Sequence, residues 1–148
     1  MLKDNISVKG DLDIVVYDTA GQPKDKRKIN NLVVAVGKNY IASRMVSNAT
    51  VVMNHLAVGS SNVTPSLSQT ILGAELDRVP LDSSSLNNNV ISYSATFGSG
   101  QAVGTISEAG IFNNASANAG IMLCRTRFNE ITRGNADTIV ITWNLTIE

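Results

Sequence analysis

The side chains best suited to catalysis stand alone in this sequence. His55 is the only histidine, so a Ser-His-Asp triad or a histidine-based metal site would have to include it. Neither a nucleophile-elbow motif nor a second histidine at ligand spacing accompanies it, and we expect His55 to be structural. Cys124, the only cysteine, excludes an internal disulfide and a cysteine-based zinc site. Because Cys124 follows Met122 and Leu123 in an apolar segment, we expect a buried, unreactive thiol.

Three aspartates near the start of the chain, Asp11, Asp13 and Asp18, are the nearest approach to a calcium site. A calcium-binding loop needs oxygen ligands at alternate positions, a glycine at the sixth position and a glutamate at the twelfth. Counted from Asp11, the sixth position is Val16, and the surrounding segment is mostly apolar. We therefore expect a strand whose carboxylates face solvent, and no metal site.

Residues 98–104 are rich in glycine and superficially resemble a phosphate-binding loop. Their third glycine comes one residue too late for the dinucleotide fingerprint, and no Lys-Ser or Lys-Thr pair follows, as a nucleotide loop requires. We interpret this segment as a flexible connection between strands. Glu75 and Glu108 have no obvious partner carboxylate for acid–base catalysis. The sequence therefore predicts a protein that is not an enzyme and that needs no cofactor.

The one basic cluster, residues 24–28, is the best candidate for contact with another molecule. It follows Pro23, and a proline with a lysine-rich run is typical of an edge strand that must not pair with other chains. Contact with nucleic acid or with an acidic protein is the functional alternative, and nearby aromatic residues that would stack on bases are lacking. The candidate partner-binding residues at this hairpin are Asp18, Lys24, Lys26, Arg27 and Lys28.

The composition indicates a single neutral domain. Of 148 residues, 43% are hydrophobic and 16% charged, against about 25% charged in ordinary soluble domains. Ser, Thr and Asn replace the missing charge, and they suit turns and the solvent faces of strands. With 12 basic and 12 acidic residues, no net charge attracts nucleic acid or an anionic membrane, whereas a neutral surface favours association. Charged residues interrupt residues 2–14, and no apolar run approaches the roughly 20 residues that cross a bilayer, so we expect synthesis in a cytoplasm.

Alternation of apolar and polar residues predicts most of the strands. It is strictest at residues 138–147, where every second residue is large and apolar, and Trp143 belongs to that buried face. Further strands are expected at residues 6–8 with 12–17, 23–36, 51–58, 77–81, 90–97, 105–112 and 121–128. Gly110 is expected to mark a bulge or a close approach of two backbones.

The remaining segments complete the predicted fold. Residues 37–46 are the best helix candidate, residues 65–76 are expected to hold one or two short helical turns, and residues 82–89 are expected to be a loop. Short strands separated by turn residues predict a mainly β fold. We expect one antiparallel, jelly-roll-like β-sandwich domain over residues 1–148, with one or two short helices. Residues 1–30 are expected to form a projecting N-terminal arm or hairpin.

Three groups of segments, taken together and in order, are similar to a known class of proteins. They are residues 31–34 with 37–44, residues 56–59 with 72–76, and residues 105–112 with 122–126 and 137–143. This pattern resembles small virion structural proteins of tailed bacteriophages, and it extends over most of the chain from about residue 30. Labels within that group include tail fibre, collar and decoration protein.

The resemblance implies a non-enzymatic part of a virion, made in the cytoplasm of a bacterial host. We expect a capsid cement or decoration protein that bridges subunits of the major capsid protein and forms a homotrimer or homodimer. Residues 1–10 and the hairpin around residues 18–28 would supply an arm that contacts a neighbour by strand addition. Neither nucleic acid nor a membrane is expected as a partner.

Two alternatives remain open at this point. One is a tail, collar or fibre-attachment protein, although the chain lacks the heptads and repeats that fibres use. The other is a module that binds host glycans, for which the chain offers one Trp, three Tyr and three Phe as stacking platforms. Alternation assigns the tryptophan among these to the core.

Overall fold

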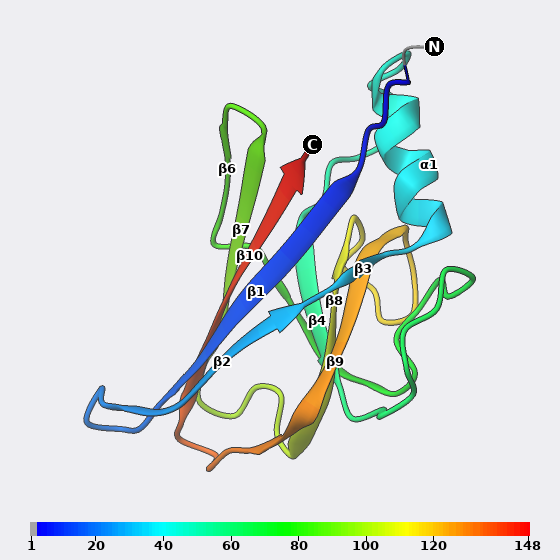
Figure 1. The fold of residues 1–148 in the computed structure, drawn as a ribbon. Helices are drawn as coiled ribbons and strands as arrows, with labels where there is room; N and C mark the ends of the chain where they lie inside the picture. The colour runs from blue at the N-terminus through cyan, green and yellow to red at the C-terminus, as the bar shows by residue number, and fades with distance from the viewer. Residues whose placement is uncertain (1–2) are drawn as a thin grey trace.

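Two antiparallel sheets of five strands each pack face to face in the computed structural model, which describes residues 3–148 (Figure 1). Sheet A has the order β2-β1-β10-β7-β6, and sheet B has the order β3-β9-β8-β4-β5. Sheet A consists of β1 (Val8–Tyr17), β2 (Pro23–Asn30), β6 (Ser83–Asn87), β7 (Val90–Phe97) and β10 (Thr138–Ile147). Sheet B consists of β3 (Leu32–Val33), β4 (His55–Gly59), β5 (Glu75–Pro80), β8 (Thr105–Phe112) and β9 (Met122–Thr132). The predicted β-sandwich is confirmed.

The core lies between the two sheets and follows from the alternation in the sequence. Every second residue of β10 from Ile139 to Leu145 is buried, and β1 presents Leu12 and Ile14 beside them. The indole N–H of Trp143 donates a hydrogen bond of 3.0 Å to Oδ1 of Asn31, which lies where the chain passes from β2 in sheet A to β3 in sheet B. This contact satisfies the polar atom of the largest buried side chain.

The outer face of sheet B is covered over its central strands, so β4 and β8 are buried on both faces. Helix α1 (Ala35–Arg44) packs against β9, and residues 60–74, the covering loop, lie over β4 and β8. Leu72 of the covering loop joins Phe112 and Met122 of the sheet in a second buried apolar cluster. Gly37 lets the helix approach closely, because a Cβ there would overlap the carbonyl group of Leu123.

The outer face of sheet A carries mostly small polar side chains and is open to solvent. The register aligns Asn144 of β10 with Asp11 of β1 on one side and Ser92 of β7 on the other. The Ser92 hydroxyl donates a hydrogen bond of 2.6 Å to Oδ1 of Asn144 across the strands. The abundance of Ser, Thr and Asn in the sequence therefore resides partly on this face.

The predicted elements agree with the structure apart from some element bounds and the segments 51–54, 65–76 and 82–89. The helix is confirmed and begins at Ala35, two residues before its predicted start. The prediction of helical turns at residues 65–76 is wrong, because the backbone there bonds to buried side chains of sheet B. The prediction of a loop at residues 82–89 is wrong as well, since Ser83–Asn87 is strand β6. Residues 51–54 lie outside any strand, and β4 starts at His55.

The N-terminal segment divides into a part inside the sandwich and a part that projects from it. Strand β1 is the second strand of sheet A, and only the turn after it extends beyond the body (Figure 1). At the opposite end, Ser7 and Glu148 exchange two backbone hydrogen bonds of 2.8 Å each, which continue the β1–β10 ladder. Residues 1–2, part of the expected arm, lie outside the described residues.

Candidate functional site

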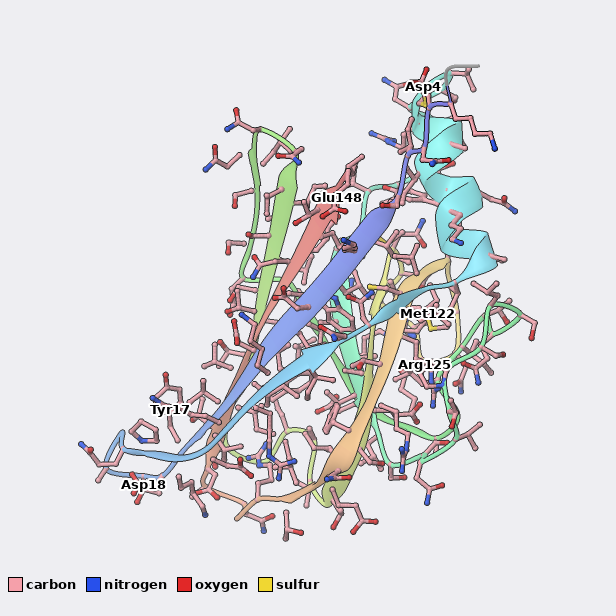
Figure 2. All side chains as sticks on the ribbon, in the orientation of Figure 1. Asp4, Tyr17, Asp18, Met122, Arg125 and Glu148 are labelled. Carbon is pink, nitrogen blue, oxygen red and sulfur yellow. The ribbon has the colours of Figure 1, made fainter. Side chains whose placement is uncertain are left out.

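Asp18 organises the projecting turn between β1 and β2. Residues 18–22, the hairpin tip, are exposed except for the half-buried Asp18, whose Oδ1 accepts hydrogen bonds of 2.9 Å from the backbone N–H groups of Ala20 and Gln22. Gly21 adopts a φ of 77°, which favours glycine. Figure 2 shows Tyr17 and Asp18 at the end of the hairpin, away from the body of the protein. The carboxylate therefore fixes the shape of the tip.

The basic residues of β2 separate into two faces of the strand. Lys24, Lys26 and Lys28 are exposed, whereas Arg27 lies on the other face. The Arg27 guanidinium donates two hydrogen bonds to the carboxylate of Asp25, at 2.9 and 3.1 Å. A third bond, of 3.2 Å, reaches the backbone oxygen of residue 129 in β9. Arg27 thus joins the hairpin to sheet B.

The base of the hairpin is joined to the loop before β10. The ammonium group of Lys24 lies 2.8 Å from Oδ2 of Asp137. The same oxygen accepts a hydrogen bond of 2.7 Å from the backbone N–H of Gly134. These bonds to Lys24 and Gly134 lower the pKa of the Asp137 carboxyl below its usual range. Within residues 3–148, no ion pair involves Lys26 or Lys28, so these two lysines are the cations that the cluster presents to solvent.

Arg133 lies next to this ion pair and connects two loops, the one after β7 and the one before β10. It is buried, and its guanidinium donates to five backbone oxygens, those of Gly98, Gln101, Gly134, Asn135 and Asp137. Two of these acceptors belong to the glycine-rich segment 98–104, which connects β7 to β8 as predicted. This segment presents carbonyl oxygens to a cation, whereas a phosphate-binding loop presents backbone N–H groups to an anion. Through Arg133 it is connected to the loop that binds Lys24.

A buried ion pair holds the covering loop on sheet B. Arg125 and Glu108 both have fully buried side chains, and the guanidinium donates bonds of 3.0 and 2.8 Å to Oε2 of Glu108. Glu108 also accepts the backbone N–H groups of Gly73 and Ala74, at 2.9 and 2.8 Å. Figure 2 places Arg125 on β9 beneath the loop. The sequence contained a signal that Glu108 needs a buried partner, since it is a charge inside an apolar strand, but that signal did not identify Arg125.

A third buried arginine side chain, that of Arg78, lies on the same face of sheet B as Arg125, toward the β5 edge. Arg78 makes two bonds to the carboxylate of Glu75, of 2.6 and 3.1 Å, and its guanidinium carbon stands 3.8 Å from the centre of the Phe112 ring. His55 lies nearby in β4, with Nδ1 2.6 Å from Oδ1 of Asn54. Burial and the charge of Arg78 lower the pKa of His55. Glu75 therefore has a cationic partner.

Cys124 is fully buried, as the sequence predicts, and burial raises the pKa of its thiol. Gly110 marks a close approach, since a Cβ there would stand 3.0 Å from Leu72 and 3.1 Å from Phe112. Among residues 3–148, no three His, Cys, Asp or Glu side chains gather as a metal site would require. No helix in this described range has the length and apolar character needed to cross a membrane.

Most of the five candidate side chains hold the shape of the hairpin, so the hairpin is a rigid projection. Of the five candidate residues, Asp18, Lys24 and Arg27 are occupied in holding its shape, while Lys26 and Lys28 remain available to a partner. No protein-family model, curated protein or solved structure matches this chain.

Proposed function

We propose that this protein is a non-enzymatic structural component of a tailed-phage virion, a capsid cement or decoration protein that bridges subunits of the major capsid protein. The observation that carries the proposal is the rigid hairpin tip, which projects from a sandwich whose loops are tied down. The resemblance in residues 31–143 supports a tailed-phage virion as the particle. The hairpin supports contact with a neighbouring subunit.

The physical argument concerns the cost of ordering a contact segment. A flexible arm loses conformational freedom when it binds, whereas a projection already held in shape loses little. The tip is fixed by Asp18, and its base is fixed by Lys24 and Arg27. Lys26 and Lys28 then present two ammonium groups beside it, which suits a partner surface with carboxylates.

Reconstitution on particles tests this proposal. Purified protein is mixed with undecorated capsids, and binding is followed by co-sedimentation and by the resistance of the capsids to heat and low salt. We expect saturable binding and higher resistance. The double variant Lys26→Glu/Lys28→Glu should bind more weakly, whereas Lys38→Glu, an equally exposed change on α1, should bind like the wild type. No binding by the wild type, or no gain in resistance, overturns the proposal.

Location in the particle separates the capsid role from the alternative in the tail. Antibodies against the protein, coupled to gold, should label the capsid surface of intact virions. Label confined to the tail or collar would replace the cement role with a tail or fibre-attachment role. A glycan array tests the remaining alternative, since specific sugar binding by the isolated protein would favour a host-glycan module.

A further inference from the structure

Strand β6 is a free sheet edge that lacks the usual protection against pairing. The other edges are protected: β2 carries Pro23 and three exposed lysines, β5 ends at Pro80, and β3 has two residues. All five residues of β6, Ser83–Asn87, are exposed, and they include neither a charge nor a proline. Figure 1 shows β6 at the margin of sheet A with no described segment beyond it.

The hairpin geometry determines which backbone groups β6 presents to this open side. Asn87 pairs with Val90 across the two-residue turn, and such a turn is closed by a hydrogen-bonded pair. Bonded pairs alternate along an antiparallel ladder, so Ser85 is also bonded to β7. The N–H and C=O groups of Ser84 and Leu86 therefore point away from β7, toward the free edge.

A hollow with a mainly apolar lining, which also includes Ser84 and Ser85, lies beside the same edge. Its volume is about 270 Å³, and Val52, Met53, Leu86 and Ile91 contribute to its lining. Leu86 is 72% exposed and Val52 is 55% exposed, which is unusual for side chains of this type. Because Leu86 is aligned with Ile91 and Leu145, it faces the side of sheet A that carries the core. The edge thus combines free backbone groups with exposed apolar surface.

We propose that β6 is a dimerisation edge, at which a second copy of this chain adds its own β6 in antiparallel orientation across a two-fold axis. The register places Ser85 opposite Ser85 of the second copy. Ser84 then exchanges backbone hydrogen bonds with Leu86 of the second copy, and the symmetric pair does the same. Leu86 of each copy lies over the hollow of the other, next to its Ser84 and Val52.

The sequence of β6 favours a second copy over a different partner. Near a two-fold axis each residue meets its own equivalent, so a charged strand would repel itself, and β6 is neutral. The nearest charge, Asp82, already accepts the hydroxyl of Thr96 at 2.6 Å. In the proposed register the two Asp82 side chains are separated by six residues along the strand, roughly 20 Å. The serines are small enough to leave room for the incoming leucine.

Cysteine cross-linking tests the register. Residues opposite each other in a non-hydrogen-bonded pair have Cα atoms about 4.5 Å apart, which lies within the range of a disulfide. Ser85→Cys should therefore form a covalent dimer under mild oxidation. Ser83→Cys is the matched control, because its two copies lie four residues apart, roughly 13 Å, and should not join. The native thiol is buried, so the wild type should stay uncross-linked.

Sedimentation velocity tests the dimer itself, and circular dichroism confirms that each variant is folded. The wild type should sediment as a dimer, Leu86→Lys should lose the dimer, and Val103→Lys, another exposed apolar position, should keep it. A monomeric wild type, a dimer that persists in Leu86→Lys, or equal cross-linking of Ser83→Cys and Ser85→Cys would each refute the proposal. These measurements use the isolated protein and do not depend on the virion role.

Discussion

At the scale of residues, buried charge determines much of this structure. Glu108 and Arg125 are fully buried, yet each has several partners, because the carboxylate accepts backbone N–H groups and the guanidinium also donates to the oxygen of Val63 at 2.9 Å. A buried ion pair is tolerated only when such additional bonds satisfy its remaining polar atoms. The ion pair therefore holds the covering loop against sheet B.

Of the two members of this ion pair, Glu108 should be the one whose removal lowers the free energy of unfolding more. Glu108→Ala leaves the buried guanidinium and the N–H groups of Gly73 and Ala74 without their acceptor, and we expect a loss of about 3–5 kcal/mol in the free energy of unfolding. Arg125→Met should cost less, because the carboxylate keeps its backbone donors. Urea denaturation of both variants measures the order, and a greater loss in Arg125→Met would contradict this account.

Asp137 should make stability sensitive to acid. Its pKa is lowered in the folded protein, so its contribution is present above the unfolded carboxyl pKa of about 3.9 and is lost as the pH falls through the folded pKa. Asp137→Asn should be less stable than the wild type at pH 7, and the difference should disappear in strong acid. Urea midpoints across this pH range provide the measurement, with Glu130→Gln as the control for removal of an exposed charge.

The sequence could predict the isolated residues but could not predict the pairs. The burial of Cys124 followed from its apolar neighbours. The partner of Glu108 did not, because the strand register places Arg127 opposite it, while the ion pair forms with Arg125 one pleat away. Arg127 is exposed. Both arginines lie on the same face of β9, and the covering loop bonds to Arg125 and leaves Arg127 exposed. The sequence did not show where along the strand the loop would lie, because the loop has no periodic pattern.

At the scale of elements, alternation predicted those strands that have one buried and one open face. Strand β6 escaped prediction because none of its residues is buried, so it has no alternation to detect. Residues 65–76 were wrongly predicted to be helical because their apolar residues have helical spacing. One of these residues, Leu72, is buried against sheet B and anchors a loop. A segment that is held mainly by backbone hydrogen bonds to its neighbour does not need a regular pattern of apolar residues, so the pattern cannot reveal it.

The packing of α1 on β9 gives a prediction at this scale. In an open helix, Gly→Ala adds about 1 kcal/mol of stability. Gly37→Ala should instead destabilise the protein, because the new methyl group meets the carbonyl of Leu123 and the helix must move. Asn39→Ala, at an exposed position of the same helix, is the matched control and should raise stability slightly. Thermal unfolding followed by circular dichroism distinguishes the two, and stabilisation by Gly37→Ala would show that α1 packs more loosely.

At the scale of the whole molecule, the two sheets are joined where the chain crosses between them at Asn31. Its Oδ1 accepts the indole N–H of Trp143, which belongs to sheet A, and the next residue begins β3 in sheet B. Trp143 is the only tryptophan and is fully buried. Its fluorescence therefore reports on the interior between the two sheets.

Loss of this contact should weaken both sheets together. Asn31→Ala leaves the buried indole N–H without an acceptor, and we expect a loss of about 1–3 kcal/mol. Asn30→Ala, at the exposed neighbouring position, should change stability little. Trp143 fluorescence and circular dichroism should give coincident urea transitions in both variants. Separate transitions would mean that the sheets unfold independently.

The backbone bonds between Ser7 and Glu148 make this protein a candidate for circular permutation. The two bonded residues are adjacent in space, so a short linker can join the ends while the chain is reopened elsewhere. The exposed loop between Ser116 and Ala117 is a suitable opening, because it interrupts no strand. We expect this permutant to fold with a melting temperature near that of the parent, since every ladder of both sheets stays intact. It would carry its new termini in the loop between β8 and β9, a segment separate from both the hairpin tip and β6.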